Sequence, residues 1–339
     1  MHFSEATKQW LRHQESLRTA ERQFRLELER MLVDIQDRFH AKQWRSNLGG
    51  DPASMIQLYR SGWPSGWGGL HYEIDSPEDL LRQGRLLLGV HVEEEVPNQT
   101  AVKTALCRLL QPHEDRLSSR CGCRIQDGAS HLVHGALDIL SLTCQGACDA
   151  VQALMETETF AEEAMFLAGK KTVWRTDLLA DQPKPNIHWT KGGGDAPIGG
   201  TGGWEFRENG GRLDTPCLTC RGDPDNYNYR DGQNIVTLFE TSRQFQNGQR
   251  VYACAVLLAP KGGRFTFHAE AGREGKWRTA FRRVFHLVPV DRWQVVSFEG
   301  QISNPEDCDF ASHGLHVHVM VTAPESGLTL DAIEIGSCE

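Results

Sequence analysis

The sequence predicts two domains, an N-terminal α+β domain with helices around a small sheet and a C-terminal all-β sandwich. Three observations support this. Apolar residues recur at helical spacing in the first forty residues, and short runs rich in β-branched and aromatic residues recur at strand spacing from residue 204 onward. Between them, residues 191–203 are rich in glycine. We therefore expect domains at 1–190 and 204–339, joined by a linker at 191–203.

Composition limits the classes of function. The chain has 339 residues, 39% of them hydrophobic, and a net charge of −9, which excludes a disordered chain and a strongly basic nucleic-acid binder. No apolar run approaches the roughly 18 to 20 residues that cross a bilayer, and the first residues lack the apolar core of a signal peptide. We expect a cytoplasmic or virion-associated protein that does not enter a membrane.

The N-terminal domain is expected to alternate helix and strand. Residues 4–40 form an amphipathic pattern that fits one long helix or two. Two strand-like segments follow at 69–74 and 85–93, and then a helix at 99–110. Apolar residues at helical spacing predict a helical segment at 126–179 that completes the domain.

The C-terminal domain is predicted from seven short runs rich in Val, Ile, Phe, Thr and Tyr, each bounded by Gly, Pro, Asn or Asp. This punctuation is typical of an antiparallel sandwich or jelly roll and not of a parallel sheet. The runs are 233–239, 251–258, 264–269, 281–287, 293–298, 315–321 and 328–335.

The order of these runs carries a resemblance. Trp204 stands near the start, Trp293-Gln294 leads into a strand, and a Leu-x-Leu-Asp-x-Ile pattern closes the chain at 328–333. In this order they resemble the galactose-binding-like jelly-roll modules that bind carbohydrate beside glycosidases. The resemblance covers residues 204–339 and implies a module that binds a ligand and does not catalyse.

The resemblance also implies where a ligand would bind. In such modules aromatic side chains stack on the C–H face of a sugar ring, and polar neighbours hold its hydroxyl groups. Tyr227 and Tyr229, in a polar loop, and Trp277, in the loop that begins at Gly272, are the candidates here. The alternative is that the two tyrosines pack a loop and that Trp277 covers the edge of the sandwich.

A structural calcium ion is implied in the same way. Many modules of this kind tie their first loop to the last strand with calcium, and Asp331 occupies the position of the carboxylate that takes part. A hard cation needs several oxygen ligands, which Asp331, Glu205 and backbone carbonyl groups could supply. The alternative is that Asp331 is a hydrogen-bonded carboxylate of a strand.

The N-terminal order of helix, strand, strand and helix faintly resembles the restriction-endonuclease-like fold. That fold implies carboxylates at strand ends that hold magnesium, and a lysine that activates water. Glu73 or Asp75 would be the first acid, and Glu93 or one of the two glutamates after it the second. The lysine is missing from its usual place, and the nearest candidate is Lys103 on the next helix, which favours a degenerate version that only binds.

Cysteine and histidine patterns suggest further metal ligands, although buried thiols and a solvated strand face are the favoured interpretations. The cysteine patterns are Cys217-x-x-Cys220 and the group Cys121, Cys123, Cys144 and Cys148. His316 and His318 share one face of a strand, which His268 or His286 could face. His131 and His134 are expected on a helix, where the sequence supplies no third ligand.

Three functions are compatible with these features. The favoured one is a non-catalytic recognition protein whose jelly roll binds a glycan or a protein surface and whose N-terminal domain docks with other subunits of an assembly, of phage virion or bacterial defence type. The second is a metal-dependent nuclease, with Glu73, Glu93 and Lys103 as its site and the sandwich as a targeting module. The third is a glycosidase accessory, which the missing signal peptide disfavours.

Overall fold

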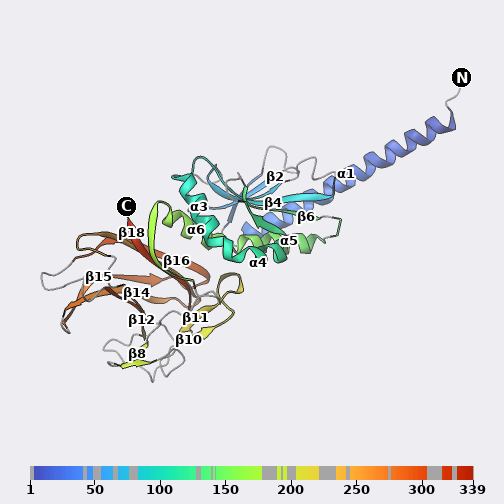
Figure 1. Cartoon of the computed structure of the whole chain (residues 1–339). Helices are drawn as coiled ribbons and strands as arrows, with labels where there is room; N and C mark the ends of the chain where they lie inside the picture. The colour runs from blue at the N-terminus through green and yellow to red at the C-terminus, as the bar shows by residue number, and fades with distance from the viewer. Residues whose placement is uncertain are drawn as a thin grey trace. The chain divides into compact units, whose positions relative to one another are not determined.

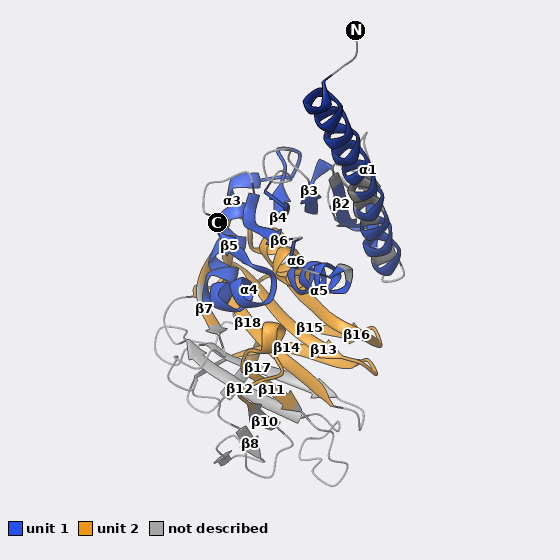
Figure 2. Ribbon diagram, turned by 90° about the vertical axis from the view of Figure 1, so that its right-hand side faces the viewer, with its two compact units in different colours: residues 1–156 blue, residues 157–339 orange. Residues whose placement is uncertain are grey.

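A computed structural model gives the architecture of the chain (Figure 1). The structure divides into two compact units, Met1–Glu156 and Thr157–Glu339 (Figure 2). None of the described helices combines the length and the apolar character needed to cross a bilayer. The residues that the structure describes are 4–40, 44–48, 55–63, 68–75, 83–126, 131–138, 140–141, 143–177, 189–191, 194–196, 204–220, 234–241, 245–273, 276–303, 315–322 and 327–338.

Unit 1 is built on an antiparallel six-stranded sheet in the order β1-β2-β3-β4-β6-β5. The predicted amphipathic helix is confirmed as a single helix, α1, whose Ile35 is completely buried. The predicted helix at 99–110 is confirmed as α3. The strands are β1 (Trp44–Leu48), β2 (Met55–Arg60), β3 (Leu70–Asp75), β4 (Arg85–Val92), β5 (Cys123–Ile125) and β6 (His131–Asp138), and the helices are α1 (Glu5–His40), α3 (Gln99–Leu110), η2 (Gln111–His113), α4 (Glu114–Cys121) and α5 (Cys144–Met155).

The predicted helical segment at 126–179 is wrong in part. Residues 131–138 form strand β6 and residues 170–177 form strand β7, so His131 and His134 lie on a strand and not on a helix. The register of β6 shifts opposite Val90 and His91. This bulge leaves the adjacent residues Leu132 and Val133 both buried, a spacing that imitates a helical repeat.

Unit 2 is a sandwich of two antiparallel sheets, and all seven strands predicted for it are confirmed. One sheet has the order β10-β11-β18-β13-β16, with β7 also paired to β18, and the other has the order β12-β17-β14-β15. The strands are β7 (Lys170–Asp177), β8 (Trp189–Lys191), β9 (Gly194–Ala196), β10 (Trp204–Arg207), β11 (Cys217–Cys220), β12 (Asn234–Thr241), β13 (Arg250–Ala259), β14 (Gly263–Arg273), β15 (Lys276–Leu287), β16 (Val290–Gln301), β17 (Leu315–Thr322) and β18 (Leu328–Cys338), and the helices are α6 (Glu158–Leu167) and η3 (Arg212–Asp214).

Alternating residues of the two sheets form the core of the sandwich. Phe265 and Phe267 of β14 are completely buried, and they belong to the same apolar cluster as Val251 of β13 and Ile333 of β18. Because successive side chains of a strand point to opposite faces, this period of two places one face of each strand in the core.

Helix α6 belongs to the sandwich unit through a buried network of charges. Glu163 of α6 binds Arg175 at 2.7 Å and Arg212 at 2.9 Å. Arg212 also binds Asp331 at 2.7 Å, and Arg175 binds Glu334 at 2.6 Å. These partners come from β7, η3 and β18. The first compact unit therefore ends at residue 156, before the boundary expected at 190.

Candidate metal centre

A group of polar side chains gathers on one face of the unit 1 sheet. In the register, Gln57 of β2 pairs with Glu73 of β3, and His71 of β3 pairs with His91 of β4. His91 in turn pairs with His131 of β6. Directly paired residues share a face, and so do residues two apart on one strand. The sheet thus brings side chains from four neighbouring strands together.

Gly89 makes room for this group. It stands opposite Glu73 on one side and opposite His134 on the other. A Cβ atom at Gly89 would lie 3.0 Å from the carbonyl oxygen of Val133 and 3.1 Å from Cδ2 of His131. Because this site lacks a side chain, the imidazole of His131 can occupy the space beside Glu73.

The donor atoms are spaced like ligands around one ion. Glu73 Oε2 lies 3.2 Å from His71 Nε2 and 3.7 Å from His91 Nδ1, and Glu73 Oε1 lies 3.6 Å from His131 Nε2. Two ligands that are each about 2.1 Å from a metal ion lie about 3.0 to 3.4 Å apart in octahedral or tetrahedral geometry. Two three-donor groups come close to this spacing, with all their ligand atoms within 4.8 Å of one another, and share His91: Glu73, His91 and His131, and His71, His91 and Glu93.

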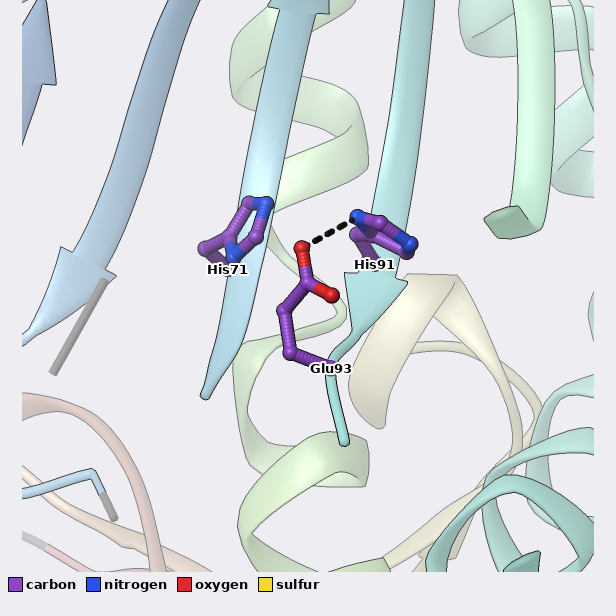
Figure 3. A group of neighbouring side chains, drawn as sticks. All are labelled: His71, His91 and Glu93. Carbon is purple, nitrogen blue, oxygen red and sulfur yellow. Dashed lines mark ion pairs between the residues drawn. The ribbon is translucent and has the colours of Figure 1, made fainter. Parts of the chain in front are cut away.

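Glu93 follows the last residue of β4, and its carboxylate points toward His91 (Figure 3). Its Oε1 lies 3.0 Å from His91 Nδ1. The backbone N–H of Glu93 donates to the carbonyl oxygen of Gly69, and its own carbonyl accepts from the N–H of Val96. The turn at the end of β4 therefore holds the backbone of Glu93 beside the cluster.

The histidines change the acidity of the central carboxylate. Burial raises the pKa of Glu73, but its interactions with His131, His71 and His91 more than offset burial, and the net pKa lies far below its ordinary value of 4.5. The same carboxylate raises the pKa of His131 above 6.5, against the opposing effect of burial. Burial and the neighbouring His131 lower the pKa of His134. Glu73 is thus an ionised carboxylate, which favours a cation beside it.

His71 lacks a consistent set of hydrogen bonds in the absence of a cation. Its side chain is completely buried, and its Nε2 lies 3.2 Å both from Gln57 Nε2, a donor, and from Glu73 Oε2, an acceptor. One ring nitrogen cannot accept from the first and donate to the second at the same time. Nδ1 of His71 has no hydrogen-bond partner. A ring nitrogen of His71 can join His91 and Glu93 as a donor, and Glu73, His91 and His131 form a second donor set, so the residues fit a metal ion.

Of the residues predicted for a nuclease site, the two carboxylates lie at this centre and the lysine does not belong to either donor group. Glu73 and Glu93 both approach His91, as a shared metal site requires. Lys103 lies on α3, is half-buried and belongs to neither three-donor group. The resemblance of unit 1 to the restriction-endonuclease-like fold remains a prediction.

The sequence carries a signal for two of the three histidines. His71 and His91 each stand two residues before a glutamate, in His71-Tyr72-Glu73 and His91-Val92-Glu93. On two adjacent strands, this repeated His-x-Glu pattern places four ligand side chains on one face.

The predicted sugar-binding residues of the sandwich are mostly beyond the described part of the chain. Tyr227 and Tyr229 lie outside the described residues. Trp277 is the second residue of β15 and pairs with Gly272 of β14, so it lies in a strand and not in the loop where we expected it. The side chain of Trp277 is also outside the described part.

Asp331 forms an ion pair and hydrogen bonds with Arg212. Its Oδ2 accepts from Arg212 Nε at 2.7 Å, and its Oδ1 accepts from the backbone N–H of Arg212 at 2.8 Å. Glu205 lies on β10, opposite Thr219 of β11, and its side chain is outside the described part. The calcium site of Asp331 and Glu205 remains a prediction.

The register of the second sheet of the sandwich places histidines opposite one another. His268 pairs with His318, and Glu270 pairs with His316. His268 Nε2 lies 3.0 Å from the hydroxyl of Thr279 and 3.5 Å from Glu270. The side chains of His316 and His318 are outside the described part, so the interpretation of this face as solvated remains a prediction.

Comparison with known proteins gives structural likeness only. No family model and no curated protein matches the chain. Among solved structures, the CBM22-1 xylan-binding domain of Paenibacillus barcinonensis Xyn10C is 10% identical, with a TM-score of 0.33 over 50% of this chain and 97% of that one. TmCBM61, solved with β-1,4-galactotriose, is 7% identical, with a TM-score of 0.27 over 41% and 84%.

A third similar structure is the enzymatically active domain of tailspike protein 4 of bacteriophage CBA120, 5% identical with a TM-score of 0.30 over 40% of this chain and 17% of that one. Likeness at this level does not decide a ligand for this chain.

Proposed function

We propose that unit 1 binds a divalent transition-metal ion through Glu73, His91 and His131. The observation that carries this proposal is the convergence of three histidines, from three adjacent strands, on one buried carboxylate. A buried carboxylate with histidines around it would be costly without a balancing cation. The carboxylate of Glu73 raises the pKa of His131, and a bound metal ion would supply the balancing charge directly.

The ligand types favour zinc or a similar ion over magnesium or calcium. Imidazole nitrogen suits zinc, copper, iron and nickel, whereas magnesium and calcium prefer oxygen ligands. A nuclease of the kind that Glu73, Glu93 and Lys103 would form uses magnesium and a lysine. The histidine-rich set therefore supports a metal site with different chemistry from that alternative.

The test is zinc binding by the full chain. We expect one zinc ion per chain at this site, measured by calorimetric titration and by elemental analysis after gel filtration. His91→Ala should weaken binding at least 100-fold, because His91 belongs to both three-donor groups. The matched control is His134→Ala, on the same sheet but in neither group. Equal zinc binding by wild type and His91→Ala would overturn the proposal.

We also propose that unit 2 binds a glycan or a protein surface, and that unit 1 docks into a larger assembly of phage virion or bacterial defence type. The observation that favours a recognition role is the architecture of unit 2, two antiparallel sheets packed face to face. A structural calcium ion held by Asp331 and Glu205 is part of the same proposal.

A glycan-array screen of the full chain, with and without calcium, tests the recognition role. We expect binding that falls on Trp277→Ala or Tyr229→Ala and persists on Trp10→Ala, an exposed tryptophan of α1. If the chain binds no glycan, a glycan is excluded as the partner of unit 2 and a protein surface is left.

A further inference from the structure

The metal centre has a buried side and an open side. The exposed fraction of the side chains rises from His71 at 0% and Glu73 at 7% to His91 at 17%, His131 at 25% and Glu93 at 32%. Structural zinc sites are closed by four protein ligands, whereas catalytic sites keep a position for water and substrate. The exposure gradient places that position on the side of His131 and Glu93.

Glu93 has the features of a general base at this open position. It is the most exposed of the five side chains, and the turn after β4 fixes its backbone. If Glu73, His91 and His131 hold the ion, the carboxylate of Glu93 lies beside the ion without being needed as a ligand. A carboxylate within reach of a metal-polarised water can take its proton.

The charge of the site favours an uncharged substrate. Three carboxylates lie at this centre: Glu73 is 3.6 Å from His131, Glu93 is 3.0 Å from His91, and Asp75 stands two residues after Glu73 on β3, on the same face. A dication offsets two of these three negative charges, so the site keeps a negative charge before substrate binds. A phosphodiester would add another negative charge, whereas a carboxylic ester or amide adds none.

We infer that this centre hydrolyses carboxylic esters or amides, with Glu93 as the general base. The inference rests on the proposed metal site. Glu93 takes a proton from water, and the water oxygen forms a bond to the carbonyl carbon. The bond from that carbon to the leaving oxygen or nitrogen then breaks, and the leaving group takes the proton from Glu93. The products are a carboxylic acid and an alcohol or amine, so no oxidant or other co-reactant is needed.

The experiment uses the full chain loaded with zinc and two probes, p-nitrophenyl acetate and bis(p-nitrophenyl) phosphate. We expect zinc-dependent hydrolysis of the ester that is lost in the metal-free protein and in His91→Ala. Glu93→Gln should bind zinc within about 10-fold of wild type and should lower kcat by about 10² to 10⁴-fold, the range of general-base catalysis. The control Glu94→Gln changes an exposed neighbour that belongs to neither three-donor group, and it should leave both quantities unchanged.

The outcomes separate the two proposals. If wild type binds no zinc, the proposed function fails. If wild type binds zinc but hydrolyses the ester no faster than His91→Ala, the metal site stands and the hydrolytic role is overturned. Loss of zinc binding in Glu93→Gln would make Glu93 a ligand and not a base. Zinc-dependent cleavage of the phosphodiester in preference to the ester would overturn the substrate class.

Discussion

Replacement of Arg212 by methionine should strongly destabilise the sandwich unit. The guanidinium is 1% exposed and binds Glu163 at 2.9 Å and Asp331 at 2.7 Å. It also lies 3.7 Å from the ring centroid of Phe160. Methionine keeps most of the apolar volume of the side chain but removes its charge. Two buried carboxylates then lose a cation that water cannot replace.

The magnitude follows from this burial. Removal of one partner of a buried ion pair costs about 3 to 5 kcal/mol, because the other charge stays buried. Arg175 still binds Glu163, and Thr215 still lies 3.3 Å from Asp331, so the effect should not exceed that range. With an m value of about 2 to 3 kcal/mol/M in urea, the unfolding midpoint should fall by about 1 to 2.5 M.

The assay is urea unfolding of the full chain, followed by far-ultraviolet circular dichroism. Hydrogen exchange of the β13 amides identifies which unfolding transition belongs to the sandwich unit. Arg282→Met is the control, since Arg282 is exposed on β15 and should change the free energy of unfolding by less than about 0.5 kcal/mol. A loss below about 1 kcal/mol in Arg212→Met would refute the reasoning. A double variant with Glu163→Gln should be less destabilised than the sum of the two single variants.

Three further predictions concern the boundary of the sandwich and the metal centre. A fragment of residues 157–339 should unfold cooperatively, and a fragment of 204–339 should be less stable in the same urea assay, since it lacks α6 and β7. Gly89→Ala should weaken zinc binding at least 10-fold by calorimetry, because its Cβ would crowd His131, whereas Gly62→Ala meets no atom within 4 Å and should have no effect. In the metal-free protein, the raised pKa of His131 contributes stability that is fully present below pH 6.5 and is lost as the pH rises through the folded-state pKa. Zinc binding needs the neutral imidazole, so zinc affinity should rise over that same pH range. Zinc affinity that does not change between pH 6 and 8 would contradict this.

Much of the fold follows from local patterns. The seven strands of the sandwich were predicted because each is a short run rich in β-branched and aromatic residues bounded by Gly, Pro, Asn or Asp, and α1 was predicted from its helical period. Strand β6 was not, because its bulge places two buried residues in succession and breaks the period of two. The assignment of α6 and β7 to the sandwich depends on ion pairs such as Glu163 to Arg212, whose partners are far apart in sequence.

The candidate site was predicted only in part for the same reason. The sequence predicts Glu73 and Glu93 as acids at strand ends, but it does not predict His71 and His91, and it places His131 on a helix. The pairing of His91 with His131 depends on the insertion of β6 next to β4, across a connection that contains the helices α3, η2 and α4 and the strand β5. A sequence period predicts which face a residue takes on its own strand, but not which strand becomes its neighbour.

X-ray absorption spectroscopy at the zinc edge of the loaded full chain tests the central claim most directly. We predict a first shell of nitrogen and oxygen atoms at about 2.0 to 2.1 Å, with the outer-shell scattering of at least two imidazole rings. In His91→Ala, bound zinc should be absent or should lose an imidazole contribution. A first shell of sulfur at about 2.3 Å would place zinc on the cysteines and contradict the account.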